Sequence, residues 1–209
     1  VALRGALFMK TLQDAVMAKG FQVIHIKTDS IKIPNATPEI IKEVYDFGKK
    51  YGYTFEHEAT YERLLLIDKA QYIAKDSCDG HWTATGKEFQ RPAIFKKLFS
   101  GEDVTIEDQA ITFEVKTHLK LGEKYIGKVG SFVPAVSGKE LTKYNDRTDK
   151  YDAATGSKGY LWELTEYAKI PEMKVTIDES YWEKERQDAI SMIEQYVPFN
   201  EFIGGPNNG

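Results

Sequence analysis

The chain has 209 residues, a net charge of −4, one cysteine and 12% aromatic residues. This length suits one large domain or two small ones, and the single cysteine excludes an internal disulfide and a cysteine-rich zinc site. A reducing, cytoplasmic setting is the expectation, and no apolar run reaches transmembrane length. The negative charge gives no general attraction to nucleic acid, so any DNA contact must come from local basic patches.

The first half of the chain predicts an α+β fold. Apolar spacing predicts a helix over 2–19 that ends at Gly20. A hairpin follows, with strands at 21–27 and 31–33 around a turn at 28–30. Thr37 supplies a capping hydroxyl and Pro38 a first-turn proline for a second helix, which Gly52 ends. Alternating residues at 53–61 predict a strand, and 63–68 and 69–75 predict one further strand or a pair. This order of elements indicates an α+β sandwich.

The second half of the chain mixes helices with a β-rich part. Residues 76–86 are typical of a loop, and 91–100 predicts a helix with a basic face. The stretch 105–121 fits either a helix or a strand, because it has near capping-box spacing but also apolar alternation. Glycines punctuate short strands over 124–163, and Asp178 starts a last helix that reaches about 197.

The turn at Thr28-Asp29-Ser30 is the first candidate site. Phosphoryl transfer to a growing nucleic-acid strand uses two divalent cations, and hard cations prefer carboxylate oxygens. A hairpin tip beside a sheet presents a carboxylate such as that of Asp29 on a stiff support. Asp and Ser are also ordinary turn residues, so a purely structural role remains open.

Three segments together resemble family B DNA polymerases of the phage type. Lys27-Thr28-Asp29-Ser30 resembles the Asp-Thr-Asp-Ser motif C of that family. Lys69-Ala70-Gln71-Tyr72 is similar to its Lys-x-x-Tyr strand, and Thr85-Gly86-Lys87-Glu88-Phe89 stands where the family passes from palm to thumb. The resemblance covers about 2–100. It implies a partial palm at 1–86 and a thumb-like region at 87–209 that contains the β-rich insertion at about 124–163.

The resemblance implies a role for each matching residue. Asp29 would be the catalytic metal ligand of a two-Mg²⁺ site that uses deoxynucleoside triphosphates. The implied contacts to primer–template DNA are Lys69, Tyr72, Lys87 and Arg91, and the accessory residues beside the metal are Lys27, Thr28 and Ser30. Lys27 departs from the family, which has an aspartate there, and a cation at this position weakens metal binding unless its side chain points away.

The site is expected to be incomplete in this chain. The other metal carboxylate of the family lies upstream of motif C, and the chain starts at Val1 inside a predicted helix. We therefore expect a fragment that works with the remainder of the polymerase chain in a bacterial or phage-infected cell, has no membrane partner and does not polymerise alone.

Two other functions remain open on the sequence. Lys27 and the acidic net charge favour a non-catalytic module with a polymerase-like fold that binds nucleic acid or protein. An unrelated α+β domain with a chance Thr-Asp-Ser turn is the third possibility. The β-rich part also mixes basic and aromatic residues, which fit either a surface for single-stranded nucleic acid or a solvated sheet face: Tyr144, Lys150, Tyr151, Lys158 and Tyr160.

Overall fold

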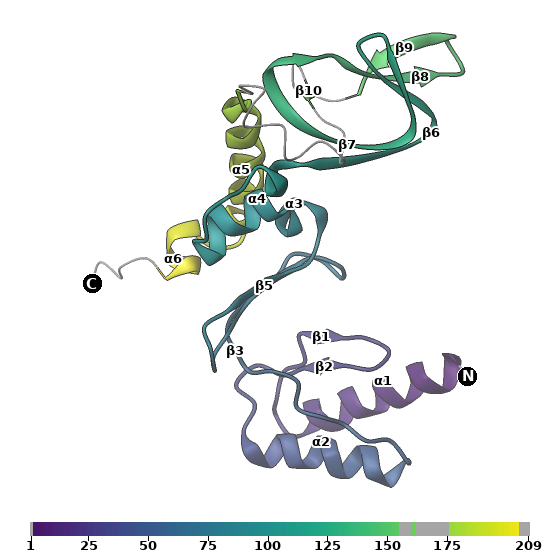
Figure 1. The fold of residues 1–209 in the computed structure, drawn as a ribbon. Helices are drawn as coiled ribbons and strands as arrows, with labels where there is room; N and C mark the ends of the chain where they lie inside the picture. Colours follow the sequence, from purple (N-terminus) through teal and green to yellow (C-terminus); the bar gives the residue numbers. More distant parts are fainter. Residues whose placement is uncertain (1, 155–159, 162–175, 205–209) are drawn as a thin grey trace. The chain divides into compact units, whose positions relative to one another are not determined.

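A computed structural model describes residues 2–154, 160–161 and 176–204. Its helices and antiparallel sheets confirm the predicted α+β class (Figure 1). The chain divides into two compact units, Val1–Thr60 and Tyr61–Gly209. The predicted palm–thumb division at 86–87 falls within the second unit and stays a prediction. No helix in these described ranges is long and apolar enough to cross a membrane.

Two helices form the core of the first unit. Helix α1 (Ala2–Ala18) ends before Gly20, whose φ of 85° lies in the region that favours glycine. Helix α2 (Pro38–Lys50) begins as predicted, because the Thr37 hydroxyl accepts a hydrogen bond from the Ile40 N–H. Buried residues from both helices make up the core: Met9, Leu12, Val16, Ile40 and Val44.

The predicted hairpin is present but shorter than predicted. Strand β1 (His25–Ile26) pairs with β2 (Ile31–Lys32) in antiparallel register. Ile26, Ile31 and Ile33 pack against the helical core of the first unit. The apolar side of the hairpin is therefore fixed to the helices, which gives the turn a firm base.

The strand predicted at 53–61 is wrong over 53–60, which has no strand pairing. The alternating aromatic residues pack on helices instead of lining a sheet. The ring of Phe8 lies 4.4 Å from that of Tyr53 and 6.0 Å from that of Phe55. A Cβ on Gly48 would come within 2.7 Å of Phe55, so the segment lies directly on α2.

The second unit begins with a three-stranded antiparallel sheet. Its order is β3 (Tyr61–Leu66), β4 (Tyr72–Asp76) and β5 (Trp82–Ala84). Asp76 ends β4 and strand β5 lies inside 76–86, so the prediction of a loop there is wrong for these four residues. Gly80, in the turn between the two strands, has a φ of 73°.

Helices and helical turns pack on this sheet and form the largest core cluster with it. They are α3 (Lys87–Gln90), α4 (Pro92–Phe95), the π-helical turn η1 (Lys96–Ser100), the 3-10 turn η2 (Glu107–Gln109), α5 (Glu179–Glu194) and α6 (Phe199–Ile203). The helix predicted from Asp178 is confirmed, and the Asp178 side chain caps it. The core cluster joins Ile73, Phe89 and Trp182, which are distant in sequence. Arg63 on β3 donates hydrogen bonds of 2.6 and 3.0 Å to the Glu201 and Phe202 carbonyls of α6.

A five-stranded antiparallel sheet confirms the β-rich part. Its strands are β6 (Ile111–Leu121), β7 (Lys124–Lys139), β8 (Leu141–Asn145), β9 (Lys150–Ala153) and β10 (Tyr160–Leu161), in the order β10-β7-β6-β8-β9 (Figure 1). Of the two alternatives at 105–121, the strand is correct from Ile111 onward. Lys158 lies outside the described residues.

Candidate functional site

Asp29 lies at the tip of the β1–β2 hairpin. The Lys27 N–H donates a 2.9 Å hydrogen bond to the Ser30 carbonyl, which leaves Thr28 and Asp29 as a two-residue turn. Lys27, Thr28 and Asp29 are exposed and Ser30 is half-buried. The Asp29 carboxylate forms no hydrogen bond or ion pair with any residue in the described part of the chain. It is therefore available to an outside cation.

Cationic groups surround this turn. Burial lowers the pKa of Lys32, and the charge of Lys27 adds to this effect while Glu58 opposes it. Burial also lowers the pKa of His25, with further contributions from Lys27 and Lys32. The buried Nε2 of His25 has no hydrogen-bond partner among the described residues. Asp29 is consequently the acidic member of a hairpin that also carries two lysines.

The Asp29 turn fits one part of a magnesium site. Mg²⁺ in phosphoryl-transfer sites is usually held by one or two carboxylates together with phosphates and water, and Asp29 is an accessible carboxylate of that kind. Within residues 2–154, 160–161 and 176–204, no group of three or more His, Cys, Asp or Glu side chains is placed to hold a metal ion. The predicted two-metal site therefore stays a prediction.

Lys69 occupies the turn between β3 and β4, not the strand in which the sequence placed it. The Asp68 carboxylate accepts hydrogen bonds of 2.7 and 2.8 Å from the N–H groups of Ala70 and Gln71. This capping of the turn by an aspartate is a local interaction that strand alternation does not reveal. Lys69 is exposed at the tip, and Tyr72 is half-buried at the start of β4.

The structure brings together two segments that the sequence identified separately. The Thr85 hydroxyl donates a 2.7 Å hydrogen bond to the Ala70 carbonyl and accepts one of 3.0 Å from the Tyr72 N–H. The Gln71 amide donates to Glu88 at 2.7 Å. Residues 69–72 and 85–88 therefore form one polar site in the second unit, with the exposed amine of Lys87 on its border. Gln71, Thr85 and Glu88 hold this site together, and sequence reasoning gave none of them a role.

Gly86 makes this close approach possible. Its φ is 97°, and a Cβ at this position would lie 2.7 Å from the Cγ of Gln71. Any other residue would both strain the backbone and displace the Gln71 side chain.

The basic stretch that follows is only partly available to DNA. Arg91 forms an ion pair with Glu185 of α5, and its side chain is 31% exposed. Any DNA contact by Arg91 must compete with this carboxylate. Lys87 is 83% exposed and lies 3.6 Å from Glu88, so its amine remains accessible. Lys97 is also exposed.

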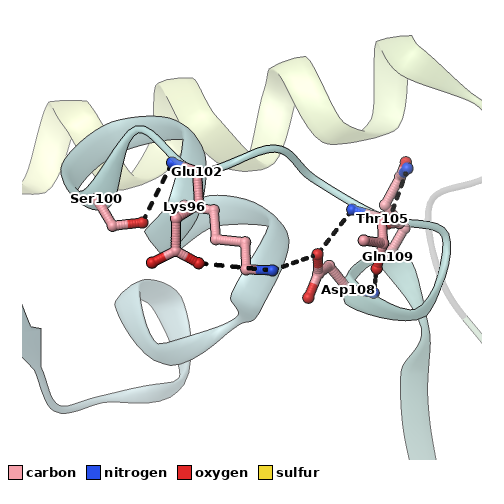
Figure 2. Close-up of polar contacts among 6 residues, drawn as sticks. All are labelled: Lys96, Ser100, Glu102, Thr105, Asp108 and Gln109. Carbon is pink, nitrogen blue, oxygen red and sulfur yellow. Dashed lines mark hydrogen bonds and ion pairs between the residues drawn. The ribbon is translucent and has the colours of Figure 1, made fainter.

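Lys96 belongs to an internal polar network. Figure 2 shows its amine between Asp108, at 2.9 Å, and Glu102, at 3.8 Å. The hydrogen bond to Asp108 raises the pKa of Lys96. Burial opposes ionisation of Asp108, yet hydrogen bonds from the Thr105 N–H and from Lys96 outweigh it and lower the pKa of Asp108. This network ties η1 to η2 and thus supports the fold where the helical part leads into β6.

Comparisons with known proteins assign no family to the chain. No protein-family model matches it, and a search of curated proteins finds no significant match. Its function must therefore be argued from the residues and their geometry.

Proposed function

We propose that this chain is part of a DNA-directed DNA polymerase. In this proposal the first unit presents Asp29 as a ligand for Mg²⁺, and the second unit contacts the primer–template duplex through Lys69, Tyr72 and Lys87. The observation that carries the proposal is the hairpin tip, where a free carboxylate stands on a turn that is anchored to a helical core. A second carboxylate would come from elsewhere in the polymerase chain.

The polymerase reaction gives each residue a physical task. The primer 3′-hydroxyl loses its proton to solvent as its oxygen bonds to the α-phosphorus of the incoming deoxynucleoside triphosphate, and the bond from that phosphorus to the bridging oxygen breaks to release pyrophosphate. Asp29 would hold a Mg²⁺ ion, which would stabilise the negative charge on the phosphoryl oxygens. The exposed Lys27 would add positive charge for the triphosphate.

The polar site in the second unit supports the same proposal. Lys69 and Lys87 carry positive charge on segments that hydrogen bonds hold together. Tyr72 belongs to the first of these segments and begins β4. Amines and hydroxyls on a fixed support position a duplex through its backbone without reading its sequence. Such contacts suit an enzyme that copies any template.

The test is the substitution Asp29→Asn in the complete polymerase polypeptide that contains this chain. We expect primer extension with Mg²⁺ to fall by about 100-fold or more, because a neutral amide is a weak ligand for a hard cation. Asp14→Asn is the matched control, because Asp14 is an exposed helix residue paired with Lys10, and it should leave the rate unchanged. Extension by Asp29→Asn at the wild-type rate would overturn the metal-ligand role.

The positive surroundings of Asp29 favour a second candidate, a non-catalytic module that binds DNA. Lys27 and Lys32 shift the electrostatics of the hairpin toward anion binding. The two functions differ in the effect of Asp29→Asn on duplex binding by the isolated chain. In a non-catalytic module Asp29→Asn tightens duplex binding with or without Mg²⁺, because a negative charge is removed. In the polymerase the same substitution changes duplex binding by the isolated chain little, and its effect is on extension by the complete polypeptide.

A further inference from the structure

One side of the five-stranded sheet carries a group of aromatic and basic residues outside any hydrophobic core. We call it the aromatic face, and it consists of His118, Lys120, Tyr125, Tyr144 and Tyr151. Tyr125 is the register partner of Lys120, and Tyr151 is the register partner of Tyr144. Direct cross-strand partners share a face of a sheet, so these residues from β6, β7, β8 and β9 form one surface.

The other side of the same strands holds the hydrophobic core of this sheet. Leu119, Leu121 and Leu141 are buried there, and they alternate along β6 and β8 with residues of the aromatic face. The tyrosines are therefore not needed to fill the core. Their position on the solvent side calls for another explanation.

The rings form a continuous patch. The His118 ring is stacked on that of Tyr144, with centroids 4.8 Å apart and an interplanar angle of 10°. It also lies 5.3 Å from the ring of Tyr125 and 5.5 Å from that of Tyr151. The Tyr151 hydroxyl and His118 Nε2 are joined by a 2.6 Å hydrogen bond. These contacts hold the rings in place before any ligand arrives, which lowers the entropy cost of binding.

Two rings of this patch remain open to an incoming group. Tyr125 is 63% exposed and Tyr151 is 39% exposed. Lys120 places its amine 4.3 Å from the centre of the Tyr151 ring. A planar group that stacks at this position would therefore meet both a ring and a positive charge.

The charge around the aromatic face favours a polyanion. Residues 111–154 carry eight lysine and arginine residues against six acidic residues, although the whole chain has a net charge of −4. Lys116 is exposed on the same strand as Lys120. It lies four residues before Lys120, so the two side chains lie on the same face of the sheet. Two acids, Asp146 and Asp149, lie in the turn between β8 and β9 near Tyr144. The Tyr144 hydroxyl donates a 2.6 Å hydrogen bond to Asp149. Pre-positioned rings beside lysines are the combination that binds single-stranded nucleic acid.

We infer that the aromatic face binds single-stranded DNA. Bases stack on Tyr125 and Tyr151, and the phosphates between them approach Lys116 and Lys120. Duplex DNA does not fit this mode, because its bases are already stacked on each other. The choice of DNA rests on the proposed polymerase function, in which the unpaired part of the template strand is the natural occupant.

The experiment measures binding of a fluorescently labelled oligo-dT to the 209-residue chain by anisotropy. We expect Tyr125→Ala and Tyr151→Ala each to weaken binding by about five-fold or more, which is the lower end of the effect of losing one base–aromatic stack. Tyr125→Phe keeps the ring and should bind like the wild type. Tyr196→Ala is the matched control, because Tyr196 is 56% exposed in the same unit but outside the aromatic face, and it should have no effect.

A second measurement tests the charge. The variant Lys116→Gln/Lys120→Gln should lower the dependence of log binding constant on log salt by about 1.4, because each phosphate contact on a single strand contributes about 0.7. The Tyr125 ring is highly exposed, so misfolding would not explain weaker binding by Tyr125→Ala. Equal binding by the wild type and Tyr125→Ala would overturn the inference. Duplex DNA that binds as tightly as oligo-dT, with the same response to the tyrosine variants, would overturn it too.

These outcomes are separable from failure of the proposed function. Loss of oligo-dT binding in the tyrosine variants with no effect of Asp29→Asn on primer extension would support the aromatic face and reject the metal site. The reverse pattern would reject the aromatic face and leave the polymerase proposal standing.

Discussion

The substitution Gly86→Ala tests how residues 69–72 and 85–88 are held together. Gly86 has φ 97° and ψ 138°, a region that costs a non-glycine residue about 1–3 kcal/mol. The new Cβ would also lie 2.7 Å from Gln71 Cγ. Gln71 must then move, and its hydrogen bond to Glu88 is lost. With Glu88 29% exposed, we assign that loss about 1 kcal/mol. The expected destabilisation of the second unit is about 2–4 kcal/mol.

The assay is urea unfolding followed by tryptophan fluorescence. Trp82 and Trp182 both belong to the core of the second unit and report its unfolding. Gly101→Ala is the matched control: Gly101 has a φ of 72° with nothing within 4 Å of the added Cβ, so only a backbone cost of about 1 kcal/mol is expected.

The added substitution Gln71→Ala separates the two contributions to the Gly86→Ala effect. It removes the contact between the new Cβ and Gln71 but leaves the backbone strain. The substitution Gly86→Ala should therefore lower the free energy of unfolding less in the Gln71→Ala background than in the wild type. If Gly86→Ala costs no more than Gly101→Ala, the close approach of the two segments does not stabilise the fold and the reasoning is refuted.

Two further predictions concern stability. Leu12 is 1% exposed, so Leu12→Ala should destabilise the first unit by about 2–5 kcal/mol and speed hydrogen exchange of the amides at 25–33. Leu7 is 66% exposed, so Leu7→Ala should have neither effect. Unchanged exchange in Leu12→Ala would show that α1 does not support the hairpin. The pKa of Asp108 in the folded chain lies below its ordinary value of 3.8. The ionised carboxylate therefore adds its full contribution to the free energy of unfolding above pH 3.8, and this contribution is lost as the pH falls through the pKa of the folded chain. Asp108→Asn should therefore destabilise the chain at neutral pH and flatten the acid side of its stability profile in urea titrations, and an unaltered profile would contradict the role given to the Lys96–Asp108 pair.

Local signals in the sequence predicted the two helices and the hairpin of the first unit. Thr37 and Pro38 predict where α2 begins, because a cap and a first-turn proline act within a few residues of the helix start. The hairpin around Asp29 was found for the same reason, since two β-branched runs and a polar turn specify it locally. The candidate site in this unit was therefore placed correctly at a hairpin tip, although its role stays a prediction.

The sequence failed where partners from distant parts of the chain decide the structure. Residues 53–60 alternate like a strand, but Phe8 and α2 supply the surface on which they pack. Lys69 was predicted in a strand but lies in a turn, because the Asp68 carboxylate accepts hydrogen bonds from the N–H groups of Ala70 and Gln71. The ion pair of Arg91 with Glu185 joins residues 94 positions apart, and no local pattern reveals such a partner.

The hydrogen bonds from Arg63 to α6 bear on the order of folding during synthesis at the ribosome. They join residues 138 and 139 positions apart, so nearly all of the second unit must be synthesised before Arg63 on β3 can bond to α6. At about 5–20 residues per second this delay is roughly 7–28 s. The first unit has its whole helical core before β3 emerges, so it folds first. The core of the second unit is complete only after α5 and α6 are made, because these helices supply Trp182, Ile193 and Phe202 to it.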